Sequence, residues 1–481
     1  MNRFTAISVA TAFAISSVFA NSTDDAINKL ESKMESLQKE IKQLKKTQKK
    51  SDKKLKRVKK TLNKVKAHDA FDNVKFSIDF RNSYNYLSYK YNDYDAKPEL
   101  EGTTVKNKEL FTQRLFLNMK SSPNPKLSFF GKFGYYKTWG GNKISDPSLK
   151  EWQEASKPIN SEFKIKEAYF VYADKYNDTP LAFSFGRRPS SDGFLANHRE
   201  NNENPSSPLA HITNMEVEAG MIKVGLENST NLPGSYVKFV YGKAHDAVTQ
   251  VNDYYNYAPL AYDYELDTNK DGVSETDTDV DFFVTVASLY NDGQYKLMAQ
   301  HATIFDTKGQ NVVGKDKKVA AGTAYLDAIS LEVNGVGDEI SDFLDETKVF
   351  LSFAHTKYMP DNGYQLLGST EDETGSSIWI GAVAPLSLGK IGVEYNHGSK
   401  YWTPITWAED SLMGSKVAVR GDAFEVYWNT KMFDMENLTA QLRYTQVQHD
   451  YTPSIRCAGW IKPVEVDIEA SNFRAMVRYQ Y

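Results

Sequence analysis

Cationic side chains recur at alternate positions in several segments of the chain. This spacing suits electrostatic interaction with solutes better than it suits catalysis. In the last ten residues, NFRAMVRYQY, Arg474 and Arg478 fall on one face of an extended chain. Phe473, Val477 and Tyr479 fall on the opposite face. Charged side chains that line a water-filled passage orient dipolar solutes and set ion preference. The same alternation gives further candidates for such a lining: Arg81, Arg114, Lys132, Arg188 and Arg443.

The segment 189–213, PSSDGFLANHRENNENPSSPLAHIT, carries side chains of the opposite charge. Its acidic residues Asp192, Glu200 and Glu203 are interleaved with Asn and Ser. A long connection of this kind is usually either functional or disordered, so a functional loop and a plain surface loop stay open as alternatives. If it faces the cationic wall, the two charges set up a field across the lumen. The alternative is that the charged side chains facing the lumen are simply hydrated and have no role in selectivity.

These residues need strands to position them, and the pattern from Lys75 onward supplies strands. Apolar and polar residues alternate there with a period of two, and long polar connections alternate with short turns such as NLPG at 231–234. Together these features predict an all-β, up-and-down transmembrane barrel of about sixteen antiparallel strands, the last of which pairs with the first. The predicted strands are 75–91, 110–120, 127–139, 163–173, 181–188, 214–228, 235–244, 279–291, 294–306, 325–333, 347–358, 377–385, 389–400, 421–433, 438–450 and 469–481.

The N-terminal region follows different patterns. Residues 1–20 have a cation near the start, then a short apolar core, and small residues at the end, a pattern that indicates a secretory signal peptide. Residues 24–67 follow a heptad repeat with apolar residues such as Met34 and Leu37 on its seam, which predicts an α-helical coiled coil. A seam needs partner helices, so we expect an oligomer, and the seam does not choose between dimer and trimer. The predicted regions are a signal peptide at 1–20, a periplasmic coiled coil at 21–70 and the barrel at 71–481.

The signal peptide, basic coiled coil, sixteen-strand pattern and terminal aromatic residue together resemble the general porins of bacterial outer membranes. The resemblance is closest to porins with an N-terminal periplasmic coiled coil, and it extends to the GRRP segment at 186–189. It implies a homotrimer in the outer membrane, passive diffusion of small hydrophilic solutes or ions, and no catalysis. It also implies that the third external connection, 189–213, folds inward and makes the constriction.

The end of the chain also resembles a porin feature. Phe473, Tyr479 and Tyr481 alternate as in the signal that the barrel-insertion machinery reads, although many porins end in Phe rather than Tyr. We therefore expect Tyr481 at the aromatic girdle of the membrane interface.

Several other motifs carry less information. The stretch DTNKDG at 267–272 opens like a calcium loop, with Asp267, Asn269 and Asp271 at ligand positions. Because position 12 is Thr278 rather than a bidentate glutamate, a solvated acidic loop is the alternative to calcium binding. The single cysteine, Cys457, provides no internal disulfide. The sequence has no recognisable nucleophile elbow, phosphate loop, zinc motif or Ser–His pair, so we expect neither a resident cofactor nor enzymatic activity.

Two functions follow from the sequence. The first is a diffusion channel in the lipid bilayer of the outer membrane. The alternative is a structural tether, in which the barrel is mainly an anchor and the lysine-rich rod binds carboxylates of the peptidoglycan. We expect no nucleic-acid partner. The openness of the lumen distinguishes the two functions.

Overall fold

The computed structural model divides the chain into two compact units, Met1–Asp72 and Asn73–Tyr481. In the first unit it describes only scattered positions between 33 and 59, all of them helical and exposed. The predicted signal peptide, most of the predicted coiled coil, the candidate calcium loop and Cys457 lie outside the described residues, so these interpretations stay predictions. The described residues of the second unit are 74–94, 100–139, 164–190, 192–245, 279–313, 317–337, 340–406, 411–454 and 462–481.

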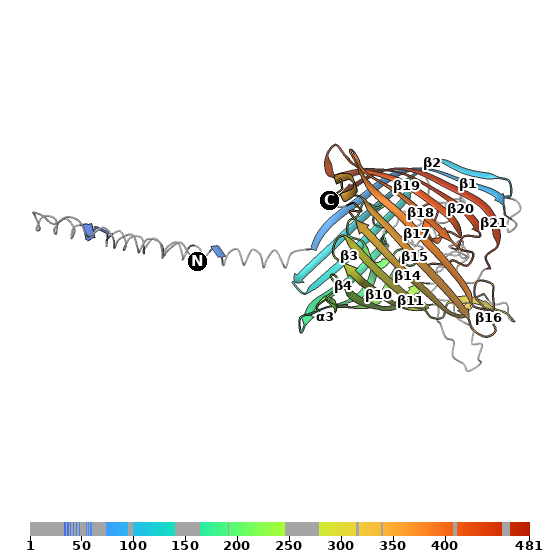
Figure 1. The fold of residues 1–481 in the computed structure, drawn as a ribbon, viewed down its shortest axis with the longest axis horizontal. Coiled ribbons are helices and arrows are strands. Elements are labelled where there is room, and N and C mark those ends of the chain that lie inside the picture. The colour runs from blue at the N-terminus through green and yellow to red at the C-terminus, as the bar shows by residue number, and fades with distance from the viewer. Residues whose placement is uncertain are drawn as a thin grey trace, which may run out of the picture. The chain divides into compact units, whose positions relative to one another are not determined.

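Sixteen antiparallel strands close into a barrel, and each strand pairs with its neighbours along the chain. Figure 1 shows the strands crossing the wall obliquely. This arrangement confirms the predicted up-and-down topology, and every predicted strand corresponds to a barrel strand. The barrel strands are β1 (Val74–Asp93), β2 (Thr104–Asn124), β3 (Leu127–Thr138), β4 (Lys164–Tyr176), β5 (Thr179–Ser190), β8 (Met215–Gly225), β9 (Tyr236–His245), β10 (Asp279–Asn291), β11 (Tyr295–Ile304), β14 (Gly322–Asn334), β15 (Lys348–Pro360), β17 (Glu373–Leu386), β18 (Gly389–Gly398), β19 (Gly421–Met432), β20 (Met435–Tyr451) and β21 (Glu465–Gln480).

Short elements occupy some of the connections. A small sheet of β12 (Lys308–Asn311), β13 (Lys317–Ala320) and β16 (Tyr364–Gln365) lies outside the ring order. The helices α3 (Glu227–Thr230) and α5 (Asp342–Asp345) each follow a barrel strand, β8 and β14 respectively. Among the described residues, no helix has the length and apolar character needed to cross a membrane.

The first and last strands close the ring, as the sequence predicts. The register places Arg478 opposite Arg81 and Gln480 opposite Asp79. Beyond the last paired strand residue, Tyr481 and Ile78 exchange two backbone hydrogen bonds of 2.7 and 2.9 Å. The backbone edges of β1 and β21 are therefore satisfied up to the last residue of the chain.

The outer face of the barrel is apolar over much of its height. On most strands, two or more outward side chains in succession are apolar, and many of them are exposed. Examples on neighbouring strands are Phe183, Phe185, Ile222, Phe239, Tyr241, Leu351, Phe353, Ile378, Ile380, Leu442 and Val477. The alternation expected from the sequence is therefore present around the ring.

The alternation of apolar and polar residues predicts that Asp281 on β10 faces inward, but this prediction is wrong. Asp281 pairs with Lys243 at 3.2 Å and accepts a hydrogen bond from the exposed Tyr241, so it lies on the outer face. The alternate residues Phe282 and Val284 are buried instead. The rule that apolar side chains face outward fails on this strand because a buried apolar core fills this part of the barrel.

Candidate functional site

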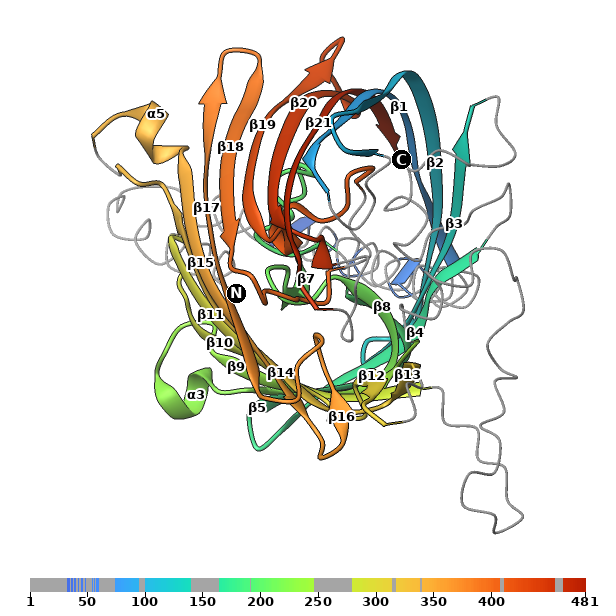
Figure 2. The ribbon, with the colours of Figure 1, turned by 90° about the vertical axis from the view of Figure 1, so that its right-hand side faces the viewer.

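The connection between β5 and β8 enters the barrel. Figure 2 shows β7 (Ser206–Leu209) within the ring of strands, and β7 pairs there with β6 (Gly193–Phe194). We call residues 192–214 the inward loop. Its apolar side chains Phe194, Leu209 and Ile212 are buried in one core with residues of β8, β10, β11, β14 and β15. This core fixes the loop against one side of the wall.

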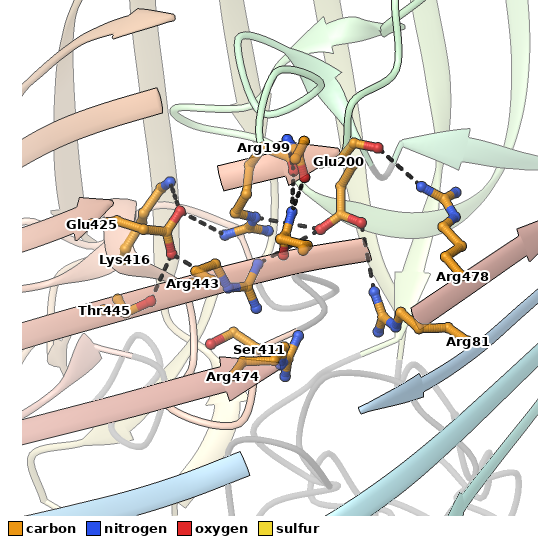
Figure 3. A network of polar contacts seen from close by, with 12 residues as sticks. Arg81, Arg199, Glu200, Ser411, Lys416, Glu425, Arg443, Thr445, Arg474 and Arg478 are labelled. Carbon is orange, nitrogen blue, oxygen red and sulfur yellow. Dashed lines mark hydrogen bonds and ion pairs between the residues drawn. The ribbon is translucent and has the colours of Figure 1, made fainter. Parts of the chain in front are cut away.

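Glu200, on the inward loop, reaches the opposite side of the wall. Its carboxylate lies 3.5 Å from Arg81 on β1 and 3.7 Å from Arg443 on β20 (Figure 3). Arg199, the preceding residue, contributes a third guanidinium at 3.4 Å. Burial would raise the pKa of the Glu200 carboxyl, but these guanidinium groups hold that pKa well below its usual range. Glu200 is therefore ionised and fixed among arginines.

A second charged group lies beside Glu200, and Lys416 is its centre. Lys416 belongs to the short helix η4 (Lys416–Ala418) and lies 2.6 Å from Glu394 and 2.5 Å from Glu425 (Figure 3). Glu425 also accepts a hydrogen bond of 2.7 Å from Thr445 and lies 3.8 Å from Arg199. The connection between β18 and β19 therefore also enters the barrel, and its charge completes one buried network with the inward loop.

Hydrogen bonds to its backbone also hold the inward loop in place. The Arg478 guanidinium donates to the backbone carbonyl of Glu200 at 2.9 Å, and Gln441 donates to the carbonyl of Arg199 at 2.7 Å. Arg478 also makes a two-pronged contact with Asp79, at 2.6 and 2.9 Å. The loop is thus held by its main chain as well as by the Glu200 carboxylate.

A polar cavity of about 430 Å³ lies between the inward loop and the wall formed by β1, β2, β3 and β21. The cations Arg114 and Arg478 pair directly with Asp79 on this wall, at 2.9 and 2.6 Å, and Lys132 pairs with Glu167. Hydrated charges of both signs can bind and orient small polar solutes. The polar and charged lining consists of Ser77, Asp79, Arg114, Asn118, Lys132, Asp192, Asn202, Arg478 and Gln480.

The fold brings a histidine and two serines together from distant parts of the sequence, where no motif indicates such a contact. His211 Nδ1 lies 2.8 Å from Ser352 Oγ, and His211 Nε2 lies 2.9 Å from Ser377 Oγ. Asn396 is the third polar neighbour of the ring, and Trp379 and Trp402 pack edge-on against it. Burial lowers the pKa of His211 to about 3. The imidazole is neutral and enclosed, which fits a structural role in holding the inward loop.

Most of the predicted site residues belong to one of two groups. Arg114, Lys132, Arg478 and Asp192 line the cavity, whereas Glu203 is exposed on the inward loop. Arg81, Glu200 and Arg443 are buried together in the network, and Arg474 is buried beside it, donating to Asn85 at 2.8 Å. Arg188, a candidate on β5, lies away from both groups and contacts Ser184 and Tyr169.

The predicted field between the cationic wall and the acidic loop therefore needs a correction. At Glu200 the loop and the wall touch, so no open lumen separates their charges there. The physical reason is that a carboxylate and guanidinium groups attract one another most strongly at direct contact, and once buried each needs the other as a partner. Only the part of the loop near Asp192 and Asn202 faces the polar cavity.

Sequence reasoning missed three charged residues of the interior. Lys166 is buried because a register shift between β3 and β4 turns both Lys166 and Glu167 toward the inside. Consecutive charges that break the alternation are the signal that predicts such a bulge. Arg199 and Lys416 belong to connections rather than strands, so alternation gave no face for them. The buried Trp402 and Leu412 in the same connection as Lys416 mark that segment as internal.

Several solved structures that are similar to this chain are outer-membrane proteins. The solved structure of Pseudomonas putida OprB is similar, with 11% identity, a TM-score of 0.47, and coverage of 87% of this chain and 96% of that chain. The outer membrane channel DcaP of Acinetobacter baumannii has 14% identity, a TM-score of 0.43, and coverage of 85% and 97%. An anion-selective porin from Comamonas acidovorans has 13% identity, a TM-score of 0.44, and coverage of 85% and 99%.

The family comparison is more specific than the structural one. A search of the curated proteins finds no match. Residues 104–479, which include fifteen of the sixteen barrel strands, match the family described as "Protein of unknown function (DUF3373)". The chain therefore belongs to the DUF3373 family.

Proposed function

We propose that the protein is an outer-membrane channel for passive diffusion of small hydrophilic solutes or ions. The observation that carries this proposal is the polar cavity of about 430 Å³ inside a closed barrel whose outer face is apolar. Charged and polar side chains such as Asp79, Asp192, Arg478 and Gln480 line this cavity, and such side chains are hydrated or paired rather than facing an empty, dry space. Arg114, Lys132, Arg478 and Asp192 line the passage, and Arg81, Glu200, Arg443 and Arg474 hold the inward loop that narrows it.

The outer face supports a membrane location. A closed barrel satisfies all strand hydrogen bonds internally, which a bilayer requires. Exposed apolar side chains such as Phe185 and Phe353 suit contact with lipid. On this proposal Phe473, Tyr479 and Tyr481 face lipid on the closing strand, where the insertion machinery reads them, and the signal peptide at 1–20 directs export.

The N-terminal unit supports an oligomer. The described seam residues Met34, Leu37 and Val58 are 61%, 54% and 63% exposed in the single chain. Apolar seam residues gain stability when helices of other subunits cover them. We propose a homotrimer with a coiled coil in the periplasm, where its lysines attract carboxylates of the peptidoglycan.

A second candidate, the structural tether, rests on a specific observation. Both the inward loop and the connection that carries Lys416 pack tightly into the barrel, and large side chains such as Trp379 and Trp402 are fully buried there. A barrel that is mainly an anchor needs no open lumen. The two candidates differ in whether solutes cross the protein.

We propose no catalytic function. In the described part of the chain His211, Ser352 and Ser377 are buried, and Trp379 and Trp402 pack against the imidazole ring. We propose no resident cofactor either, and calcium at Asp267–Gly272 stays a candidate that metal titration of the full chain can test.

The test is solute entry into liposomes that contain the purified full-length protein. A channel lets small sugars and amino acids enter and swells the liposomes, and larger sugars enter more slowly. Liposomes that contain heat-denatured protein are the control. If swelling equals that of the control for every solute, the barrel is not a channel and the tether becomes the better account.

A further inference from the structure

Two lysines face each other on the inner wall. The register of β8 and β9 places Lys223 directly opposite Lys238. Lys238 is only 6% exposed, while its neighbours Val237 and Phe239 lie on the other face of the strand. Like charges at directly opposed positions destabilise a sheet, and burial increases that cost. A bound anion would remove this cost.

A third cation joins the pair from the adjacent strand. Arg188 on β5 donates a hydrogen bond to Ser184, which lies on the same face four residues back along the strand. The guanidinium carbon lies 5.0 Å from the centre of the Tyr169 ring. Lys223 lies two residues before the end of β8, and Lys238 lies two residues after the start of β9, so both are near the same end of the barrel. The Arg188 side chain points toward that end in this conformation.

The side chains that contact these cations are neutral. The Lys223 ammonium lies 3.8 Å from the centre of the Tyr236 ring. In the part of the chain that the structure describes, no carboxylate lies within ion-pair distance of Lys223 or Lys238. Glu167, which acts on Arg188 electrostatically, is already paired with Lys132. Among the described residues, therefore, no free carboxylate compensates the positive charge of this cluster.

We propose that Arg188, Lys223 and Lys238 form a binding site for a small oxyanion, a phosphate or a carboxylate. An oxyanion accepts charge-assisted hydrogen bonds from ammonium and guanidinium groups at once, and it removes the repulsion between the two lysines. Arg188 supplies a planar fork that suits such oxyanions, and the lysines supply point charges. The site was not among the pore-lining candidates of the sequence, apart from Arg188.

The place of the site in the barrel gives it a role in passage. It lies near the short-turn end, where β8 ends at Gly225 and β9 begins at Tyr236. This is also the end that carries Val74 and Tyr481, since alternate connections of an up-and-down barrel share one end. An anion that passes the inward loop meets the site before it leaves the barrel. This role rests on the proposed channel function, whereas the binding itself rests on the three cations alone.

Binding is measured directly on the purified full-length protein in detergent, by equilibrium dialysis with radiolabelled inorganic phosphate. We expect saturable binding that weakens by about tenfold in Lys223→Gln and in Lys238→Gln, because each removes a charge-assisted contact. Lys223 is half-exposed, so its variant keeps the test valid if the buried Lys238→Gln variant does not fold. The matched control is Lys243→Gln, on the same strand β9 but on the outer face beside Asp281, which should bind phosphate like the wild type.

Competition with succinate separates the two ligand chemistries. Displacement of phosphate by succinate indicates a general oxyanion site, and a lack of displacement indicates a phosphate site. Direct dialysis with labelled succinate covers a site that takes carboxylates alone. The proposal is overturned if neither anion binds, or if Lys223→Gln and the wild type bind equally well. Because dialysis needs no transport, binding without conductance would leave the site in place and remove only the channel.

Discussion

The Glu200 carboxylate and the Arg81 guanidinium lie 3.5 Å apart, although one belongs to the inward loop and the other to the first barrel strand. Both side chains are buried, and Arg443 from the opposite end of the barrel sequence lies 3.7 Å from the same carboxylate. Glu200 thus joins β1 and β20, which lie on either side of the closing strand β21. The inward loop is held where the ring closes.

Replacing Glu200 with Gln should loosen the inward loop. Several buried guanidinium groups would lose their anionic partner, and breaking a buried pair from one side costs about 3–5 kcal/mol. We expect a lower free energy of unfolding and a larger, noisier conductance, measured by urea unfolding in detergent and by planar bilayer recordings. Glu203→Gln is the control, because Glu203 is an exposed acid on the same loop. Equal effects of the two variants would mean that the Glu200 contacts do not fix the loop.

Acid should destabilise the barrel partly through His211. The folded pKa is lowered to about 3 from an ordinary value of 6.5. The unfolded chain therefore binds a proton that the folded chain does not, and stability falls as the pH decreases from about 6.5 toward about 3. His211→Gln should be less stable than the wild type at neutral pH but lose less stability on acidification. His397→Gln, on the outer face, is the control. Identical pH dependence in all three proteins would contradict this role of His211.

The barrel could be predicted in detail because alternation is a local property of each strand. Strands such as β10 and β18 begin at the predicted residue, and the closure of β1 against β21 follows from an even count. The interior could not be predicted to the same depth. The contact between Glu200 and Arg81 joins residues far apart in sequence, and the bulge at Lys166 changes a face without changing composition. Alternation also assigns side chains to the wrong face of a strand where an apolar core fills the barrel, as it does at Phe282.

The closing strand gives a test of the lipid-facing assignment. Val477 is exposed on the outer face, so Val477→Arg places a charge in hydrocarbon and should cost about 2–4 kcal/mol if the residue lies near the middle of the bilayer. Gln480→Ala, on the cavity side, should assemble normally. Heat-modifiable migration of the protein in outer membranes measures assembly. Normal assembly of Val477→Arg would show that this face does not contact lipid.

Removing the last three residues, Tyr479 to Tyr481, should impair assembly more than either substitution. The deletion removes both hydrogen bonds between Tyr481 and Ile78 and leaves part of β1 without a partner. Unpaired backbone groups in hydrocarbon cost several kcal/mol each. Protease resistance at the cell surface would measure the loss, and a fully resistant truncated protein would contradict the importance of closure at this position.

Deleting residues 24–67 should leave a barrel that inserts but assembles less stably with other copies. The exposed seam residues Met34, Leu37 and Val58 would no longer provide contacts between subunits. Light scattering in mild detergent measures the mass of the wild type and of the deletion variant. A wild-type protein that is monomeric under these conditions would contradict the proposed oligomer.

Passage of water and ions through the barrel beside the inward loop is measured by single-channel conductance in planar bilayers under a potassium chloride gradient. We predict discrete openings, with a reversal potential that favours the anion because three cations, Arg114, Lys132 and Arg478, line the cavity against two carboxylates, Asp79 and Asp192. Lys132→Glu should shift that potential toward the cation, and Lys243→Gln on the outer face should not. An absence of openings in reconstituted, correctly assembled protein would contradict the channel and leave the tether as the better account.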